Sequence, residues 1–131
     1  MSEELNIIKE QLTRYQSLLD RLTQFAVDVI MLLRKLDNSV ELRVIKYQLI
    51  KSCTSSGANY DEAQAASSIA DFSNKIKISL KEMRESNYWI KIILKINDSH
   101  ISELKHLLNE SDELKKILGS IAVKTTKSRS R

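Results

Sequence analysis

The residues with the clearest potential for chemistry are Glu103 and His106, which are spaced so that a carboxylate and an imidazole share one face of a helix. The same Glu-x-x-His spacing recurs in helical bundles that hold two metal ions bridged by carboxylates. Such a site needs a second copy of the motif on another helix, and the other histidine, His100, follows Asn97 where a glutamate is required. The sequence therefore favours ordinary surface roles for Glu103 and His106. A carboxylate-bridged metal enzyme is the least favoured function that we consider.

Other groups that enzymes use are scarce. Cys53 is the single cysteine and has no base in its sequence context, which favours an inert core thiol over a nucleophile. The chain has neither a Gly-rich phosphate loop nor a Ser–His–Asp set with supporting turns. We therefore predict a protein that is not an enzyme, binds no cofactor, holds no metal and takes no small-molecule substrate.

The cellular setting is indicated by the cysteine and by the apolar runs. A lone cysteine cannot form an internal disulfide, and no N-terminal stretch combines a basic region with the apolar run of a secretion signal. The longest apolar runs, such as Ile92-Ile93-Leu94, are far shorter than the roughly 20 residues that span a bilayer. These features predict a cytoplasmic protein without a membrane partner.

The most informative pattern is a row of cations between residues 77 and 95. Steps of four and three place six side chains on one helical ridge beside the apolar face: Lys77, Lys81, Arg84, Tyr88, Lys91 and Lys95. No acidic residue interrupts the row, so it could follow the phosphates of an RNA while Tyr88 stacks on a base. The alternative is an ordinary solvated flank in which Glu85 neutralises Lys81 and Arg84.

A second basic segment, KTTKSRSR, runs from residue 124 to residue 131. Its four cations are Lys124, Lys127, Arg129 and Arg131, and without them the 21 lysines and arginines fall to 17, equal to the 17 acidic residues. The net charge of +4 therefore belongs to this segment. We predict a flexible tail, which is either a solvated end or a basic arm that touches phosphates.

The elements that position these residues are expected to be helices. The 131 residues include two glycines and no proline, so little interrupts a helix. Apolar residues recur at helical spacing in four segments, at about 3–36, 40–65, 69–97 and 100–122. The expected fold is all-α, with one domain of residues 1–123 that forms an antiparallel up-and-down four-helix bundle with long helices. Caps for the last three helices are expected at Ser39, at Ser68 with Asp71, and at Asp98 or Ser99.

The first helix carries the most regular apolar stripe, and its two halves differ. From Leu18 onward the apolar face widens, which predicts deep burial. The narrow first half is expected to pack through a coiled-coil-like seam. The stripe follows alternating steps of three and four along ten residues: Leu5, Ile8, Leu12, Tyr15, Leu19, Leu22, Ala26, Val29, Leu33 and Leu36.

Further features concern how helices meet. Small side chains fill the second helix between residues 52 and 59, so we expect Gly57 and Ala58 to lie at a close helix–helix contact. The inward face of the same helix is expected to hold Leu42, Ile45, Leu49, Cys53, Ser56 and Tyr60. Self-association is predicted by apolar residues of the third helix that lie outside its inward stripe, such as Ile78, Trp89, Ile92 and Ile96.

The segment from Gln48 to Ile93 also resembles a known family. The residues that carry the resemblance are Gln48-Leu49, Ser52, Ser55, Gly57-Ala58-Asn59, Glu62-Ala63, Asp71-Phe72, Lys75, Leu80-Lys81-Glu82, Arg84-Glu85 and Tyr88-Trp89. They are similar to those of the bacterial four-helix bundle family named for proteins encoded in intervening sequences of 23S ribosomal RNA genes. The LKKILGSI segment from Leu114 to Ile121 resembles this family too.

The resemblance implies an antiparallel bundle that assembles as a ring, typically a homopentamer, without known enzymatic activity. One branch of relatives, the accessory proteins of diversity-generating retroelements, is basic and partners a reverse transcriptase and its RNA. This chain departs from that branch in the balanced charge of residues 1–123. We therefore expect a cytoplasmic homo-oligomeric scaffold that binds structured RNA or a nucleic-acid-binding protein through the row of cations. The alternative is a purely structural or protein-binding module.

Overall fold

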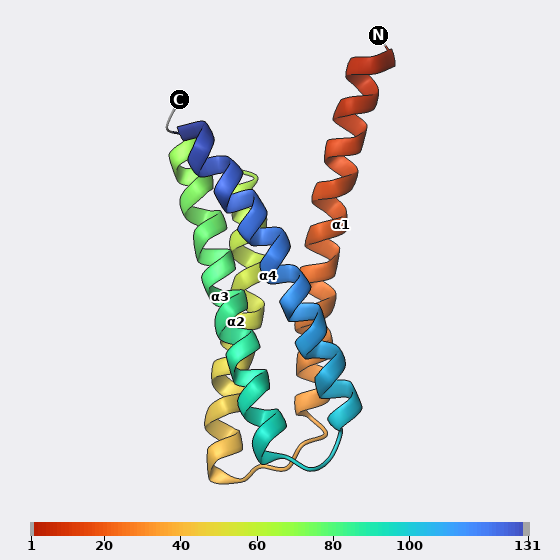
Figure 1. Cartoon of the computed structure of the whole chain (residues 1–131), viewed down its shortest axis with the longest axis vertical. Helices are drawn as coiled ribbons and strands as arrows, with labels where there is room; N and C mark the ends of the chain where they lie inside the picture. The colour runs from red at the N-terminus through yellow and green to blue at the C-terminus, as the bar shows by residue number, and fades with distance from the viewer. Residues whose placement is uncertain (1, 130–131) are drawn as a thin grey trace.

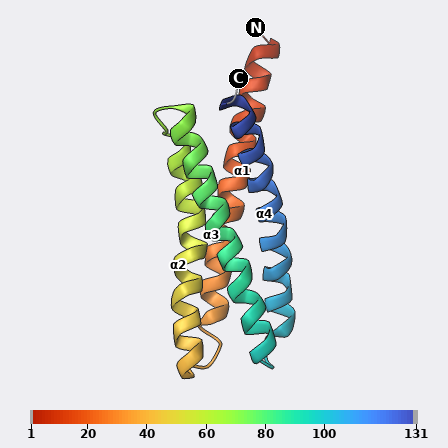
Figure 2. The same ribbon diagram turned by 60° about the vertical axis from the view of Figure 1, so that its left-hand side comes forward.

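The structure is a computed structural model that describes residues 2–129, with the side chains of residues 15, 16, 128 and 129 outside that description. Figure 1 shows four long helices: α1 (Ser2–Leu33), α2 (Val40–Ala63), α3 (Ile69–Ile96) and α4 (Ile101–Arg129). Successive helices run in opposite directions, and a second view shows the same arrangement (Figure 2). The predicted all-α, antiparallel four-helix bundle is confirmed.

Polar side chains cap α2 and α3 where the sequence indicates. Ser39 accepts a hydrogen bond from the Leu42 backbone N–H at 3.4 Å, and Ser68 accepts one from the Asp71 backbone N–H at 3.0 Å. The Asp71 carboxylate accepts in turn from the Ser67 backbone N–H at 3.2 Å, one residue before the cap. Both helix starts therefore follow from local side-chain chemistry.

The start of α4 differs from the prediction. The sequence points to Asp98 or Ser99 as the cap, but the first helical hydrogen bond runs from the Leu104 N–H to the His100 carbonyl oxygen at 3.0 Å. His100 is therefore the residue that precedes the helix, and its φ of 57° lies in the left-handed region. The chain reverses tightly after Asn97, and helical periodicity does not encode the geometry of such a turn.

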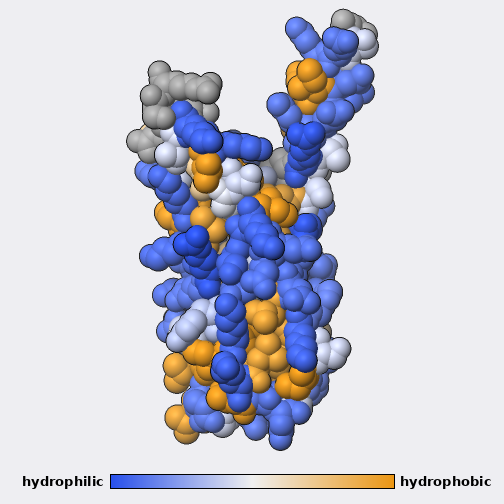
Figure 3. All heavy atoms as spheres, viewed as in Figure 1, coloured by the Kyte–Doolittle hydropathy of each residue, from blue (hydrophilic) through white to orange (hydrophobic). Residues whose placement is uncertain are grey.

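Each helix contributes one buried face to a single core. The α2–α3 interface is the most extensive, the α3–α4 interface follows, and α1 meets α4 least. Charged side chains cover much of the outer surface around smaller apolar areas (Figure 3). Within residues 2–129, no helix is both long and apolar enough to cross a membrane. The predicted inward residues of α2 are all buried: Leu42, Ile45, Leu49, Cys53, Ser56 and Tyr60.

Buried serines hold α2 and α3 close together. The hydroxyls of Ser52 and Ser86 lie 2.7 Å apart, and neither side chain is exposed. One turn further along, Ser56 donates to the Ser79 carbonyl oxygen at 2.9 Å, and Ser79 donates to the Ser56 carbonyl oxygen at 2.7 Å. Because each hydroxyl has a partner, its burial costs little, and the small side chains let the two helices approach closely.

α1 joins the bundle with its second half only. Its apolar stripe is buried from Leu22 to Leu36, whereas Leu5, Ile8 and Leu12 are 42%, 52% and 56% exposed. All residues from 2 to 14 are exposed, and this part of α1 extends away from the other helices (Figure 1). The coiled-coil-like seam predicted for this half therefore has no partner helix within the described chain.

Ion pairs connect α1 to α4. Arg21 Nη2 lies 2.5 Å from Glu110 Oε1 and 2.8 Å from Glu113 Oε2, while Lys35 Nζ lies 3.1 Å from Glu103 Oε2. The hydrogen bond with Glu110 raises the pKa of Arg21 above its ordinary value. α1 and α4 diverge toward the end of the molecule that carries both termini (Figure 1).

The last helix is longer than the sequence indicates. α4 continues to Arg129, beyond the predicted helix end near residue 122, so residues 124–129 are helical where the sequence predicts a tail. Thr125 is buried, and the hydroxyls of Thr125 and Thr126 donate to carbonyl oxygens one turn earlier. Cations near a helix C-terminus also interact favourably with the helix dipole, which helps a basic segment to stay helical.

Gly57 lies where α2 contacts α1, whereas Ala58 is exposed, so the expected close contact holds for Gly57 and is wrong for Ala58. A β-carbon at residue 57 would lie 3.5 Å from the Leu22 Cβ, an ordinary contact distance.

Gly57→Leu should overpack this contact and lower the free energy of unfolding by about 1–3 kcal/mol. Gly57→Ala fits the space and should raise the free energy by about 0.5–1 kcal/mol through its helix propensity.

Urea unfolding followed by circular dichroism measures both changes. Ala58→Leu is the matched control, because an exposed substitution should change the free energy of unfolding by no more than about 0.5 kcal/mol. A Gly57→Leu protein as stable as the parent would contradict the contact between Gly57 and Leu22.

Candidate nucleic-acid interface

α3 turns one face to the core and keeps all six residues of the predicted cation row exposed. We name this set the basic ridge: Lys77, Lys81, Arg84, Tyr88, Lys91 and Lys95. The core face is fixed by Ile76, Met83 and Ile90, which are fully buried, and the ridge follows about 100° around the helix. At the helical rise per residue, the ridge is about 27 Å long.

The cations of the basic ridge are not neutralised by ion pairs. Among the described residues, none of the five has a carboxylate within 4.0 Å. Glu85, which the alternative hypothesis pairs with Lys81 and Arg84, interacts instead with Glu82. The pKa of Glu82 is raised, first by burial and then by Glu85, while Lys81 acts in the opposite direction. The ridge therefore presents its positive charge to solvent.

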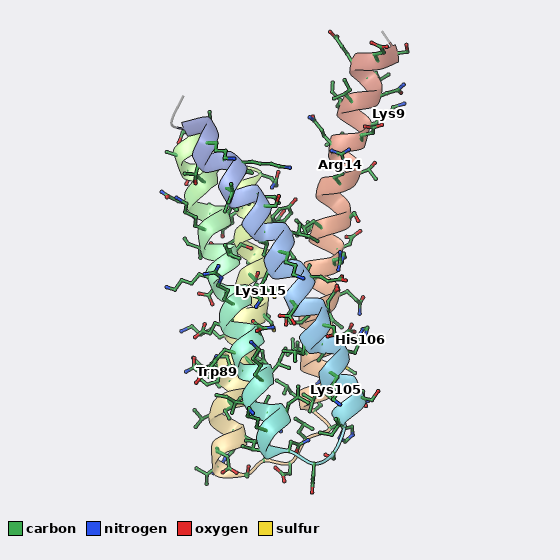
Figure 4. All side chains as sticks on the ribbon, viewed as in Figure 1. Lys9, Arg14, Trp89, Lys105, His106 and Lys115 are labelled. Atoms are coloured by element: carbon green, nitrogen blue, oxygen red, sulfur yellow. The ribbon has the colours of Figure 1, made fainter. Side chains whose placement is uncertain are left out.

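Tyr88 places an aromatic ring among the cations. Its side chain is 56% exposed and meets Trp89 edge to face, with ring centroids 5.3 Å apart and an interplanar angle of 63°. Trp89, labelled in Figure 4, packs against the core. The half-buried Trp89 thus supports Tyr88 while leaving part of the Tyr88 ring free to stack on a base.

Asn87 connects the basic ridge to α4. Its side-chain amide donates to Ser111 at 2.7 Å and to Asp112 at 2.9 Å, and its amide oxygen accepts from Lys115 Nζ at 3.4 Å. Lys115 also lies 3.3 Å from Asp112. This network places the Lys115 ammonium between α3 and α4, beside Asn87, which directly precedes Tyr88 of the ridge. Figure 4 labels Lys115 on α4.

The alignment of α3 with α4 also brings Lys105 close to the basic ridge, although the sequence patterns did not single this residue out. Lys105 precedes Asp112 by two turns of α4, so it lies on the side of α4 that faces α3, and it is exposed. Because α3 and α4 are antiparallel, Lys105 is opposite the end of the ridge that holds Lys95. Periodicity within one helix could not reveal this, because the position depends on how two helices are aligned.

The C-terminal cations lie elsewhere. Lys124 follows Lys115 by two and a half turns and is therefore on the opposite side of α4, where it lines a cleft between α1 and α4. Lys127 is exposed on the last part of α4. The side chain of Arg129 and the whole of Arg131 are outside the described residues. The structure thus separates Lys124 from the basic ridge.

Glu103 and His106 lie on the side of α4 that faces α1, away from the basic ridge. Figure 4 labels His106 at that edge of the helix. Glu103 is engaged by Lys35, as described above. Within the described part of the chain, no three His, Cys, Asp or Glu side chains gather closely enough to hold a metal ion.

A comparison with models of protein families identifies the family of this chain. Residues 10–120 match the model of the family described as 23S rRNA-intervening sequence protein. The chain belongs to this family. The match reaches from α1 to α4, so the resemblance seen between Gln48 and Ile93 extends over most of the chain.

A solved structure agrees with the assignment. It is that of a protein from Bacteroides thetaiotaomicron VPI-5482, described as having unknown function and as belonging to the S23 ribosomal protein family. The two chains are 36% identical, with a TM-score of 0.73, and the match covers 80% of this chain and 97% of the relative. A search of the curated proteins found no match. These comparisons show the family and the fold.

Cys53 is a core thiol. Its side chain is 1% exposed, and its Sγ donates to the Ile50 carbonyl oxygen at 3.4 Å. Burial raises the pKa of Cys53 to about 12. Because the thiolate is the reactive form, this thiol should stay inert near neutral pH.

We expect iodoacetamide at pH 8 to label Cys53 in the folded protein at least about 100-fold more slowly than in urea, because the thiol must first be exposed by opening of the core. Mass spectrometry of quenched samples measures the two rates. Labelling of the folded protein at the rate of the unfolded chain would contradict the burial of Cys53.

Proposed function

We propose that this protein is a non-catalytic, homo-oligomeric scaffold of the cytoplasm that binds structured RNA through the basic ridge. The observation that carries the proposal is the row of five exposed, unpaired cations on α3 with Tyr88 among them. On the neighbouring helix α4, the exposed Lys105 adds a further cation, while Lys115 is paired with Asp112. Such a surface suits phosphate groups, because each phosphate contact releases condensed counterions.

The spacing of the ridge supports a backbone contact. Neighbouring cations are three or four residues apart, which puts their β-carbons about 5–6 Å from one another. A straight row of this kind can contact successive phosphates along one strand of a folded RNA, and these contacts need no particular base sequence. Tyr88 adds a stacking surface for an unpaired base, which favours RNA with loops or bulges over a plain duplex.

Assembly would multiply the effect of each ridge. Residues 1–123 carry equal numbers of basic and acidic residues, so one copy has little net charge outside its last segment. In the homopentamer that the family resemblance implies, five ridges would repeat around a closed ring and give a band of positive potential. Several weak phosphate sites then act on one RNA molecule with higher overall affinity.

A protein-binding module is the second candidate function. The exposed apolar stripe of Leu5, Ile8 and Leu12 is a surface of the kind that binds another helix. The two candidates respond differently to salt, since phosphate contacts weaken steeply as salt rises and apolar contacts do not.

The triple substitution Lys77→Glu, Lys81→Glu and Arg84→Glu tests the basic ridge. We expect it to weaken RNA binding at low salt by at least about 100-fold and to lower the slope of log affinity against log salt by about three units, since each lost phosphate contact removes roughly one. Fluorescence anisotropy with a structured RNA at several salt concentrations measures both quantities.

The control reverses the same number of charges at scattered exposed positions, Lys9→Glu, Arg34→Glu and Arg43→Glu. It should reduce affinity far less, because these residues do not form a row. Circular dichroism must show that both variants fold. A folded ridge variant that binds as tightly as the parent would overturn the ridge, and a parent that binds no RNA at low salt would favour the protein-binding module.

Lys105→Glu tests the contribution of α4. If the surface extends across both helices, this single exposed change should lower the salt slope by about one unit. Lys124→Glu, on the same helix, is the matched control, because Lys124 is exposed and lines the cleft on the other side of α4. Equal effects of the two substitutions would indicate a general charge effect and contradict the extended surface.

A further inference from the structure

The end of the bundle that carries both termini has a place for a further helix. In the half where α1 packs against α4, Leu107 and Leu114 of α4 are buried. Ile117 and Ile121 continue this face of α4 for about two more turns, but they are only partly buried. α1 and α4 diverge toward this end (Figure 1). The other three helices therefore leave apolar surface here, whereas α1 covers it in the closed half.

A cleft of about 980 Å³ lies over this surface, between α1 and α4. Its floor includes Leu18, Phe72 and Ile117, which belong to the core or pack against it. Figure 3 shows apolar surface at the base of the space between the two diverging ends. We call this opening the α1–α4 cleft, and residues from all four helices line it.

The α1–α4 cleft has room for about two to three turns of a helix. Its walls run from Gln11 to Arg21 on α1 and from Lys116 to Lys124 on α4. At the helical rise per residue, these walls are about 15 Å and 12 Å long. A helix about 10 Å wide and 12 Å long fills roughly 950 Å³, which is close to the volume of the cleft. The opening therefore fits a short helix in both length and width.

The charged side chains that line the α1–α4 cleft are all positive. Four basic residues and no acidic residue belong to the lining: Arg14, Arg21, Lys116 and Lys124. Arg21 is already paired with two carboxylates of α4. Arg14 lies 4.0 Å from Glu10 on the exposed part of α1, and the two lysines form no ion pair among the described residues. Both walls of the cleft thus present positive charge above an apolar floor.

We propose that the α1–α4 cleft binds an amphipathic helix of another protein, with its apolar stripe on the floor and acidic residues on both sides of that stripe. Burial of the stripe drives the contact, as it does for other helices that bind in grooves. The acidic flanks meet Arg14 on α1 and Lys124 on α4, and this charge match favours one kind of partner and one orientation. Phosphates alone would leave the floor uncovered, so the cleft suits a ligand that is both apolar and acidic.

Two synthetic peptides of about 18 residues, long enough to form a helix, test the cleft of the full-length protein. Both carry a leucine stripe at helical spacing, which is flanked by glutamates in the acidic peptide and by lysines in the basic peptide. Fluorescence anisotropy measures the binding of each labelled peptide. We expect the acidic peptide to bind at least about tenfold more tightly than the basic peptide. Equal affinities would overturn the assignment of the cleft to an acidic helix.

Two variants locate the binding site. Ser120→Trp fills the cleft from an exposed position and should weaken binding of the acidic peptide at least about tenfold. Asn109→Trp is the matched control and should bind like the parent, because Asn109 is exposed on nearly the same face of α4, about three turns away and outside the lining. Arg14→Glu with Lys124→Glu should reverse the preference, so that the basic peptide binds more tightly than the acidic one.

The reversal of charge remains informative if Ser120→Trp does not fold, and circular dichroism checks the folding of every variant. A folded Ser120→Trp protein that binds the acidic peptide as tightly as the parent would place the peptide outside the cleft and overturn the assignment. A charge variant that keeps the preference of the parent would overturn it too. If Ser120→Trp abolishes self-association in analytical ultracentrifugation, the occupant is a second copy of this chain and not a partner helix.

The basic ridge must be separated from the cleft. The triple ridge variant described above should bind the acidic peptide like the parent at physiological salt, where distant charges are screened. Loss of peptide binding in this variant would move the contact to the ridge and overturn the role of the cleft. Displacement of the peptide from the same variant by structured RNA would show a general polyanion site and have the same consequence. A parent that binds the acidic peptide in the cleft but no RNA would overturn the proposed RNA binding alone.

Discussion

The close contact of α2 with α3 through buried serines is the feature on which the rest of the bundle depends. The reciprocal hydrogen bonds of Ser56 and Ser79 satisfy polar groups inside the core and oppose sliding of one helix along the other. α4 is then aligned on α3 by Asn87, which meets Ser111 and Asp112 in a single register. α1 has the smallest share of the core contacts, so the bundle closes firmly on the α3–α4 side and opens between α1 and α4.

Much of the fold could be predicted because it depends on local chemistry. Serine caps and apolar spacing mark the helices, and the inward face of α2 follows from its period alone. The exposure of residues 2–14 of α1 could not be predicted. The spacing of apolar residues shows which face of a helix is apolar, but it does not show what covers that face. The helical end of α4 was missed for a related reason: its last segment has no apolar stripe, and its threonine hydroxyls bond within the helix itself.

The candidate site was predictable in part. The basic ridge lies on one helix, so the spacing of Lys77, Lys81 and Arg84 was enough to place them on one exposed face. Lys105 and Lys115 belong to another helix, and their positions follow from the Asn87 network, which joins residues far apart in the sequence. The separation of Lys124 from the ridge has the same origin, since it depends on which face of α4 meets α3 and which meets α1.

The short length of the exposed segment of α1, residues 2–14, limits the stability of its outer turns. Isolated helices shorter than about 12–15 residues are marginal in water, and residues 2–14 have no tertiary contact to add to their own hydrogen bonds. The outer turns of α1 can therefore unwind while the inner turns stay closed with the core. Amide hydrogen exchange should therefore be fast at the outer end of α1 and should slow along the helix to the rate set by global unfolding. The helical content of the outer end would increase when a partner binds to it.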